Sequence, residues 1–314
     1  MSETSKKILK LGTRNSPLAL KQADMVSQAL QQAHADIEVE LVSMTSAADW
    51  KKQDGEKSLC EQAGGKGQFA KEIEKAHLSG DIDFGVHSLK DMASVLPEGL
   101  EIKYVLPRAD VRDAFISAKY SSIDELPKGA VVGTCSPRRQ AIILSKRPDL
   151  KVVPFRGNVQ TRLDKVRSGQ VDATFLAMAG LTRLGIEDEM IHPLSVEEML
   201  PACGQGIICI ETKSNASDIG AIMEAIHCQN TGLCAAAERE VLKVLDGSCH
   251  TPIGAYAMME GDVLHLRAQV LSLDGQQSFF DEVQQPCAND EEATKLGHDL
   301  AQKIKAILPA GILM

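Results

Sequence analysis

The chain has 314 residues, enough for two or three domains of ordinary size, and its composition is that of a globular protein. Its net charge of -9 argues against a nucleic-acid partner, because a phosphate backbone binds basic surfaces. No apolar run reaches the roughly 18 residues of a membrane helix. The polar residues 1–10 lack the apolar core of a signal peptide, so we expect a cytoplasmic protein with no membrane partner.

The eight cysteines predict free thiols, because disulfides are rare in long chains without export signals. His227, Cys228 and Cys234 are close in sequence but lack the spacing of zinc ligands. We therefore expect no metal.

The first residues have the pattern of a βαβ unit. Residues 8–11 alternate as a strand, Ser16 is a good helix N-cap, and Pro17 is a good first helical residue. Residues 39–44 have the pattern of the next strand, so a parallel sheet is predicted. A helix N-terminus after such a turn is suited to binding an anion.

The polar residues 47–67, with several glycines, predict a long loop of the kind that forms a lid, and residues 69–78 a helix. Residues 82–87 then alternate as a strand, and Lys90 and Asp91 follow its end. Ligands of open α/β sheets bind beyond the carboxyl ends of strands, so this is the position of a catalytic or binding pair. A solvated salt bridge would give the same local pattern.

A second α/β unit begins near Asp113, after a strand at 102–105 and a crossing segment at 107–112. Ser136 and Pro137 repeat the helix start of the first unit. The predicted strands of this unit are 131–134, 152–155 and 171–177, and a second crossing at 201–205 leads to a strand at 207–210. Two similar halves joined by two crossings predict a hinged pair of lobes with a cleft.

The last third of the chain predicts a small α+β domain. Its expected helices are 217–227, 234–245 and 290–308, and its expected strands are 253–258, 263–272 and 278–283, with a hairpin at Asp274 and Gly275. The fold class is therefore α/β, with two doubly wound lobes and a small C-terminal α+β domain. The predicted domains are 1–107 with 205–227, then 108–204, then 228–314.

Cations recur at predicted strand ends and helix starts. They are Arg14, Lys90, Arg138, Arg139, Arg156, Arg162 and Arg183. Arginine binds carboxylates in a bidentate manner, so the repeated placement favours a polyanionic ligand. Any one of these residues taken alone is better interpreted as an ordinary surface cation. Asp91 would be an anion among them, able to stabilise a developing cation or move a proton. Cys249 lies in a predicted turn, where the pattern alone favours an ordinary thiol.

An ordered set of motifs spanning nearly the whole chain resembles the porphobilinogen deaminase (hydroxymethylbilane synthase) family. The motifs are Thr13-Arg14-Asn15-Ser16-Pro17-Leu18-Ala19, Gly64-Gly65-Lys66-Gly67, Val86-His87-Ser88-Leu89-Lys90-Asp91, Arg138-Arg139-Gln140, Arg156-Gly157-Asn158-Val159 with Thr161-Arg162, Gly204-Gln205-Gly206, and Gly247-Ser248-Cys249 with Pro252-Ile253-Gly254. The resemblance implies three domains, two of them like the lobes of a periplasmic binding protein.

The resemblance also implies a transferase of porphyrin and haem biosynthesis. Such an enzyme condenses four porphobilinogen molecules, with release of ammonia, into the linear tetrapyrrole hydroxymethylbilane. A dipyrromethane cofactor would be attached through a thioether to Cys249. The implied partners are porphobilinogen as substrate and uroporphyrinogen-III synthase as acceptor of the product, and we expect a monomer.

The resemblance assigns roles to residues of this chain. Asp91 and Lys90 match catalytic positions, with Asp91 stabilising cationic pyrrole species. The cofactor would contact Lys90, Asp91, Ser136, Arg138 and Arg139, and the substrate would contact Arg14, Ser16, Phe69, Arg156, Arg162, Arg183 and Gln205.

The predicted lid departs from the family pattern at residues 46–49 and at Gln62, and the segment before Gly64 is longer than usual. These departures leave a second hypothesis, a non-catalytic protein of the same fold that binds an anion or a tetrapyrrole. The joint presence of Asp91 and Cys249 favours the enzyme. A nicotinamide-dependent dehydrogenase is disfavoured, because no glycine fingerprint follows the first strand.

Overall fold

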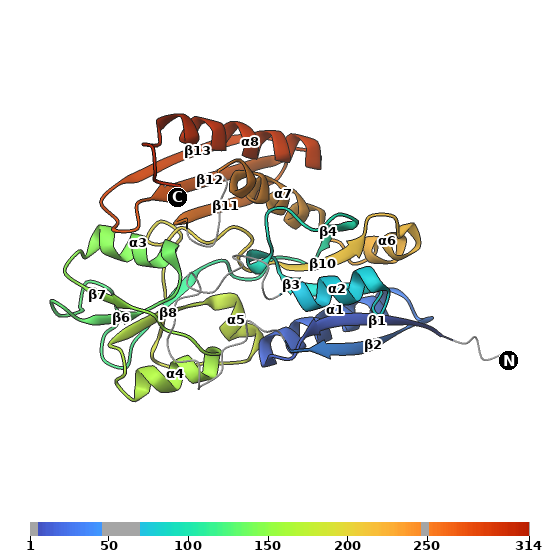
Figure 1. Ribbon diagram of the computed structural model, residues 1–314, viewed down its shortest axis with the longest axis horizontal. Helices are drawn as coiled ribbons and strands as arrows, with labels where there is room; N and C mark the ends of the chain where they lie inside the picture. Colours follow the sequence, from blue (N-terminus) through green and yellow to red (C-terminus); the bar gives the residue numbers. More distant parts are fainter. Residues whose placement is uncertain (1–5, 46–69, 246–250, 314) are drawn as a thin grey trace. The chain divides into compact units, whose positions relative to one another are not determined.

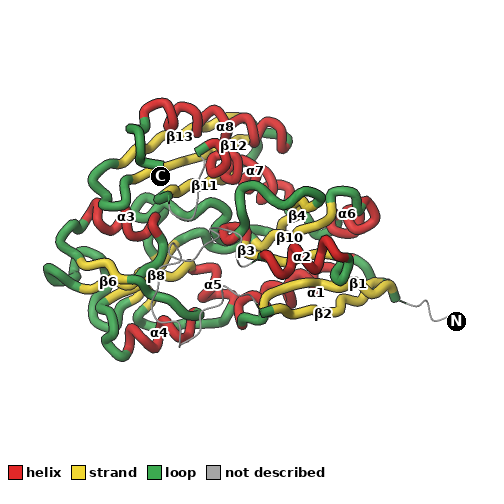
Figure 2. Tube along the Cα trace, viewed as in Figure 1, coloured by secondary structure: helices red, strands yellow, loops and turns green. Residues whose placement is uncertain are grey.

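The computed structural model describes residues 6–45, 70–245 and 251–313. Figure 1 shows the order of their helices and strands, and Figure 2 shows how loops join them. The chain forms two compact units. Within the described residues, the first comprises residues 6–45, 70–109 and 207–232, and the second comprises residues 110–206, 233–245 and 251–313. The three-domain boundaries given above remain a prediction.

The first unit has a five-stranded sheet in the order β2-β1-β3-β10-β4. Its strands are β1 Lys7–Arg14, β2 Ile37–Met44, β3 Phe84–Ser88, β4 Leu100–Val105 and β10 Ile208–Lys213. β1 pairs with β2 and β3 in parallel, as predicted, whereas β10 is antiparallel to both β3 and β4. The chain thus returns to this sheet at β10, which runs in the opposite direction to β3 and β4.

Helices α1 (Pro17–Ala33) and α2 (Lys71–Ser79) cover opposite faces of this sheet. Leu9 and Leu11 of β1 share a buried cluster with the apolar residues of α1 and α6 (Ser217–Glu224). Gly12 points the other way, where an added Cβ would lie 3.3 Å from Cγ2 of Ile73 in α2. Because successive residues of a strand face opposite sides, both faces of the sheet are buried, as in a doubly wound fold.

The second unit repeats this topology in the order β7-β6-β8-β5-β9. Its strands are β5 Asp113–Ile116, β6 Val131–Gly133, β7 Lys151–Val153, β8 Ala173–Ala177 and β9 Ile191–Pro193, and its helices are α3 Pro137–Lys146, α4 Val159–Arg167 and α5 Met178–Arg183. β6 is parallel to β7 and β8, and β5 is antiparallel to β8 and β9. The prediction of two similar α/β halves is confirmed.

A three-stranded antiparallel sheet in the order β11-β12-β13 follows in the second unit. Its elements are β11 Ile253–Glu260, β12 Val263–Leu271 and β13 Ser278–Pro286, with helices α7 Gln229–Val244 and α8 Asp290–Ile307. Alternate residues of β12, such as Leu264 and Leu266, are fully buried in one cluster with α7 and α8. The predicted small α+β domain is confirmed.

Several predicted features differ from the structure or lie outside the described residues. β5 and β9 were not predicted as strands, and α7 begins at Gln229 rather than at residue 234. Arg183 is the last residue of α5 and not at a helix start. The predicted lid, residues 47–67, lies outside the described residues.

No helix of the described ranges combines the length and the apolar character needed to cross a membrane.

Candidate functional site

A small cavity lies in the first unit where β1 and β3 end. It is lined by Arg14 at the end of β1, Ser16 at the start of α1, Gln22 within α1, His87 near the end of β3, and Asp91 after it. Ser16 caps α1, its hydroxyl accepting a hydrogen bond from the N–H of Ala19 at 3.3 Å. The structure therefore brings together predicted residues that are 77 positions apart, from Arg14 to Asp91.

Asp91 and Lys90 belong to one turn of 3-10 helix, Leu89–Asp91, directly after β3. Both side chains are half-buried, and Asp91 lines the cavity. Ser88, the last residue of β3, accepts a hydrogen bond from Gln22 Nε2 at 2.8 Å, which ties the strand end to α1. The predicted catalytic pair thus follows the carboxyl end of a central strand.

Three buried titratable side chains lie beside this cavity. His77 of α2 contacts Glu211 of β10, with Nδ1 3.0 Å from Oε1, and His87 Nε2 lies 3.6 Å from the other oxygen of Glu211. Burial lowers the pKa of His87, an effect that the charge of Glu211 opposes. Sequence reasoning missed this cluster because β10 is distant in the chain from α2 and β3, which are close to each other.

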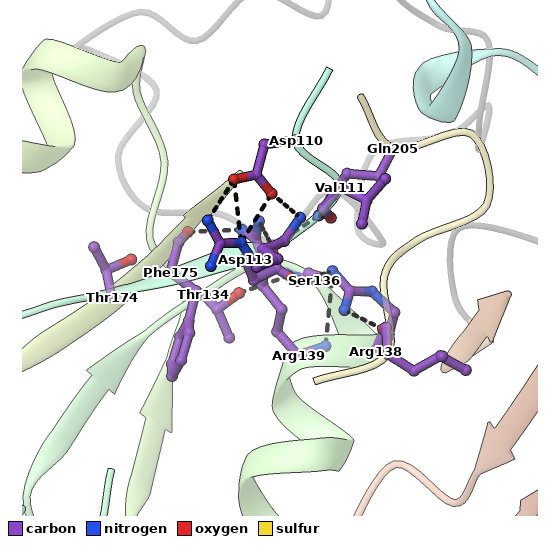
Figure 3. Close-up of polar contacts among 12 residues, drawn as sticks. Asp110, Val111, Asp113, Thr134, Ser136, Arg138, Arg139, Thr174, Phe175 and Gln205 are labelled. Carbon is purple, nitrogen blue, oxygen red and sulfur yellow. Dashed lines mark hydrogen bonds and ion pairs between the residues drawn. The ribbon is translucent and has the colours of Figure 1, made fainter. Parts of the chain in front are cut away.

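In the second unit the predicted cofactor residues meet around Asp113, the first residue of β5 (Figure 3). Asp113 is fully buried, and it accepts hydrogen bonds from Arg138 Nη2 at 2.7 Å and from Arg139 Nη2 at 2.5 Å. Gln205 Nε2 lies 3.3 Å from the same carboxylate. One anion is therefore shared by two buried arginines, which leaves a local excess of positive charge.

Backbone carbonyls fix the two guanidinium groups further. Arg138 donates to the carbonyl of Leu200 at 2.7 Å, and Arg139 donates to that of Phe175 at 2.6 Å. Ser136 caps the helix that carries both arginines, as predicted, by accepting from the N–H of Arg139. The orientation of both arginines is thus determined by the fold itself.

The remaining predicted arginines lie on neighbouring segments of the same unit. Arg156 is buried directly before α4, and Arg162 in α4 donates to the carbonyl of Gly157 at 2.8 Å. Arg183 donates to the carbonyl of Gly206 at 2.7 Å. Phe69 and Cys249, also predicted site residues, lie outside the described residues.

Arg183 is a candidate residue for binding an anion. Its buried Nε has no hydrogen-bond partner within the part of the chain that the structure describes. Burial lowers the pKa of this guanidinium to about 10, and no neighbouring acid is among the causes. A half-buried guanidinium whose Nε has no partner among the described residues fits a ligand that brings its own carboxylates, as pyrroles with acetate and propionate side chains do.

Together these observations define an α/β protein of two doubly wound lobes and a small α+β domain, with cations at strand and helix ends. A family model described as "Porphobilinogen deaminase, dipyromethane cofactor binding domain" matches residues 9–221. A second, "Porphobilinogen deaminase, C-terminal domain", matches residues 232–306. The chain belongs to the porphobilinogen deaminase family.

Curated relatives agree with these matches. The porphobilinogen deaminase of Nitrobacter hamburgensis is 45% identical over 297 residues, which cover 94% of this chain and 92% of that protein. The porphobilinogen deaminase of Paracoccus denitrificans is 44% identical over 308 residues, covering 96% and 95%.

Similarity to solved structures is weaker. The periplasmic VFT2 domain of Bordetella pertussis BvgS matches at 14% identity with a TM-score of 0.40, over 70% of this chain and 86% of that chain.

Proposed function

We propose that the chain is a porphobilinogen deaminase, which condenses four porphobilinogen molecules head to tail into hydroxymethylbilane and releases ammonia. The observation that carries this proposal is the match to the cofactor-binding family model over residues 9–221, which contain both the Asp91 cavity and the Asp113 cluster. When bound, the dipyrromethane supplies the terminal pyrrole carbon from which the chain grows.

In the proposed site, cations bind the carboxylates of the pyrroles. Arg138 and Arg139, fixed by Asp113, and Ser136 at the start of α3 hold the cofactor, together with Lys90 and Asp91. Arg14, Ser16, Arg156, Arg162, Arg183, Gln205 and Phe69 hold the substrate. Bidentate arginine contacts give both affinity and orientation, and that orientation brings the reacting carbons together.

Asp91 acts on the charge that develops during the reaction. When the aminomethyl nitrogen leaves as ammonia, positive charge appears on the incoming pyrrole, and a nearby carboxylate lowers the energy of that state. The half-buried position of Asp91 in the cavity favours this role, since electrostatic interactions are stronger away from bulk water.

Cys249 is the proposed attachment point of the cofactor, through a thioether, and this assignment rests on the sequence motif. A cytoplasmic location fits the described cysteines that are thiols rather than disulfides, Cys135, Cys203, Cys209, Cys228, Cys234 and Cys287. A monomeric state and transfer of the product to uroporphyrinogen-III synthase complete the proposal.

The stoichiometry of the reaction tests this function. Purified protein incubated with porphobilinogen is expected to release four ammonia molecules for each linear tetrapyrrole formed, measured by an ammonia assay and by absorbance after oxidation of the product. Consumption of porphobilinogen without tetrapyrrole, or binding without ammonia release, would refute the proposal.

A further inference from the structure

Beside the Asp91 cavity, His77, Glu211 and His87 form a buried row that the proposed function does not use. The exposed fraction is 7% for His87 and 0% for the other two. His77 comes from α2, Glu211 from β10 and His87 from β3, so three elements of the first unit converge on one carboxylate. Buried ionisable groups of this kind are costly unless they are paired, and they concentrate at functional sites.

One end of the row must hold a proton. His77 Nε2 lies 3.0 Å from the backbone carbonyl of Asp83, which can only accept, so Nε2 carries a hydrogen. Nδ1 of the same ring lies 3.0 Å from Glu211 Oε1. Two acceptors at this distance would repel, so a proton lies between them, on either the imidazole or the carboxyl group.

The other end of the row can take up a proton. His87 Nε2 and Glu211 Oε2 face each other at 3.6 Å, and within the described residues neither atom has a hydrogen-bond partner. Gly85, two residues earlier on β3, leaves the space for this arrangement, since a Cβ there would lie 2.8 Å from His87 Nε2. The absence of a side chain at Gly85 therefore leaves space for the His87 imidazole beside the Glu211 carboxylate.

The surroundings of His87 together favour its neutral form. Burial, the largest cause, lowers its pKa below 6.5, and the nearby His77 and Arg14 act in the same direction. Glu211 and Asp91 oppose this shift. Glu74 of α2 faces Glu211 as well, and burial, followed by the charge of Glu211, raises the pKa of Glu74 to about 6.

We propose that His87 accepts the proton that each condensation releases, and that Glu211 stabilises the resulting imidazolium. This inference rests on the proposed function. In each condensation the bond between the aminomethyl carbon and its protonated nitrogen, an ammonium group, breaks, and ammonia leaves with the electron pair. The same carbon forms a bond with a ring carbon of the growing chain. That ring carbon then loses its proton, whose bonding electrons restore the aromatic ring, and His87 takes the proton.

His87 suits this task better than Asp91. A protonated Asp91 would no longer stabilise positive charge on the pyrroles, so a separate acceptor preserves its role. His87 lines the same cavity as Asp91. A neutral imidazole has one ring nitrogen without a hydrogen, and this nitrogen can accept a proton. A carboxylate behind an imidazole favours the charged form, as in other acid–base arrangements of histidine.

The first test is the pH dependence of turnover in the loaded enzyme. His87→Gln is expected to lower kcat by about 100-fold or more with little change in KM, the usual effect of losing a general base. In a plot of kcat against pH, the acid limb is the fall in kcat toward low pH. Glu211→Gln is expected to move this acid limb to lower pH, because removing the carboxylate lowers the pKa of His87. Glu74→Gln is the matched control, a buried carboxyl of α2 that also faces Glu211, and it is expected to leave the limb in place.

The second test uses imidazole ¹⁵N NMR of the wild-type holoenzyme without substrate, so it does not depend on turnover, and a variant is needed only to assign the signal. The His87 ring is expected to gain its proton at a lower pH than an ordinary exposed histidine does, whereas an imidazolium at pH 7 would overturn the inference. His87→Asn assigns the signal if His87→Gln does not fold.

Three kinetic outcomes separate this inference from the function on which it rests. A wild type that releases no ammonia from porphobilinogen refutes the proposed function and this inference together. An active wild type whose kcat and acid limb are unchanged in His87→Gln refutes this inference alone. An acid limb that moves in Glu74→Gln and not in Glu211→Gln assigns the titration to Glu74 and also refutes it.

Discussion

Replacing Asp113 by Ala is expected to destabilise the second unit by about 3–5 kcal/mol, because removal of one partner leaves buried charges uncompensated. Arg138 and Arg139 are 4% and 7% exposed, so water cannot replace the lost carboxylate. Urea unfolding followed by circular dichroism measures the effect. The sequence context of Asp113, at the first residue of a short strand, gives no hint of this role.

Asp110→Ala provides the matched control for Asp113. Asp110 lies three residues earlier and also pairs with an arginine, Arg112, at 2.7 Å, but both side chains are substantially exposed. Exposed ion pairs contribute about 0–1 kcal/mol, so this variant is expected to unfold within about 1 kcal/mol of the wild type. Equal losses in the two variants would contradict the account of Asp113 as the counter-charge of a buried arginine pair.

Replacing Asp91 by Asn is expected to lower kcat by about 100- to 1,000-fold, with the fold and the bound cofactor retained. The substitution keeps the size of the side chain and removes its charge, so it removes the stabilisation of positive charge in the transition state. Initial rates with saturating porphobilinogen measure the effect, and intact mass verifies that the variant is loaded.

The same variant separates the enzyme from the alternative of an anion-binding protein. A pure binder would keep its affinity for porphobilinogen, or bind more tightly once a negative charge is gone, and would show no turnover to lose. Asp81→Asn is the control, since this exposed carboxylate lies before β3 and accepts from Ser79 rather than lining the cavity. Wild-type kcat in Asp91→Asn would contradict the assigned role.

Local signals in the sequence predicted the helix starts well. Ser16 and Ser136, each followed by proline, cap α1 and α3 as expected, because capping depends on neighbouring residues alone. β5 and β9 were missed since they have four and three residues and no alternation of apolar and polar side chains. Their place in the sheet is determined by pairing with β8 and with each other.

In the candidate site, too, features that depend on neighbouring residues could be predicted, and contacts between distant residues could not. Positions that follow strand ends, such as Lys90 and Asp91, could be predicted from periodicity, whereas their partners could not. His77 and Glu211 are 134 residues apart, and no local pattern reports a contact at that separation. The antiparallel entry of β10 opposite β3 brings Glu211 beside Gly85, and this pairing creates the buried row.

The central claim is that the chain builds a tetrapyrrole on a primer held by Cys249, and the intact mass of the purified protein tests it most directly. The purified protein is expected to exceed the mass of the polypeptide without cofactor, the bare chain, by two linked pyrrole units, and Cys249→Ser is expected to abolish this excess. A wild-type mass equal to that of the bare chain, unchanged after incubation with porphobilinogen or hydroxymethylbilane, would contradict the account and favour the binding protein.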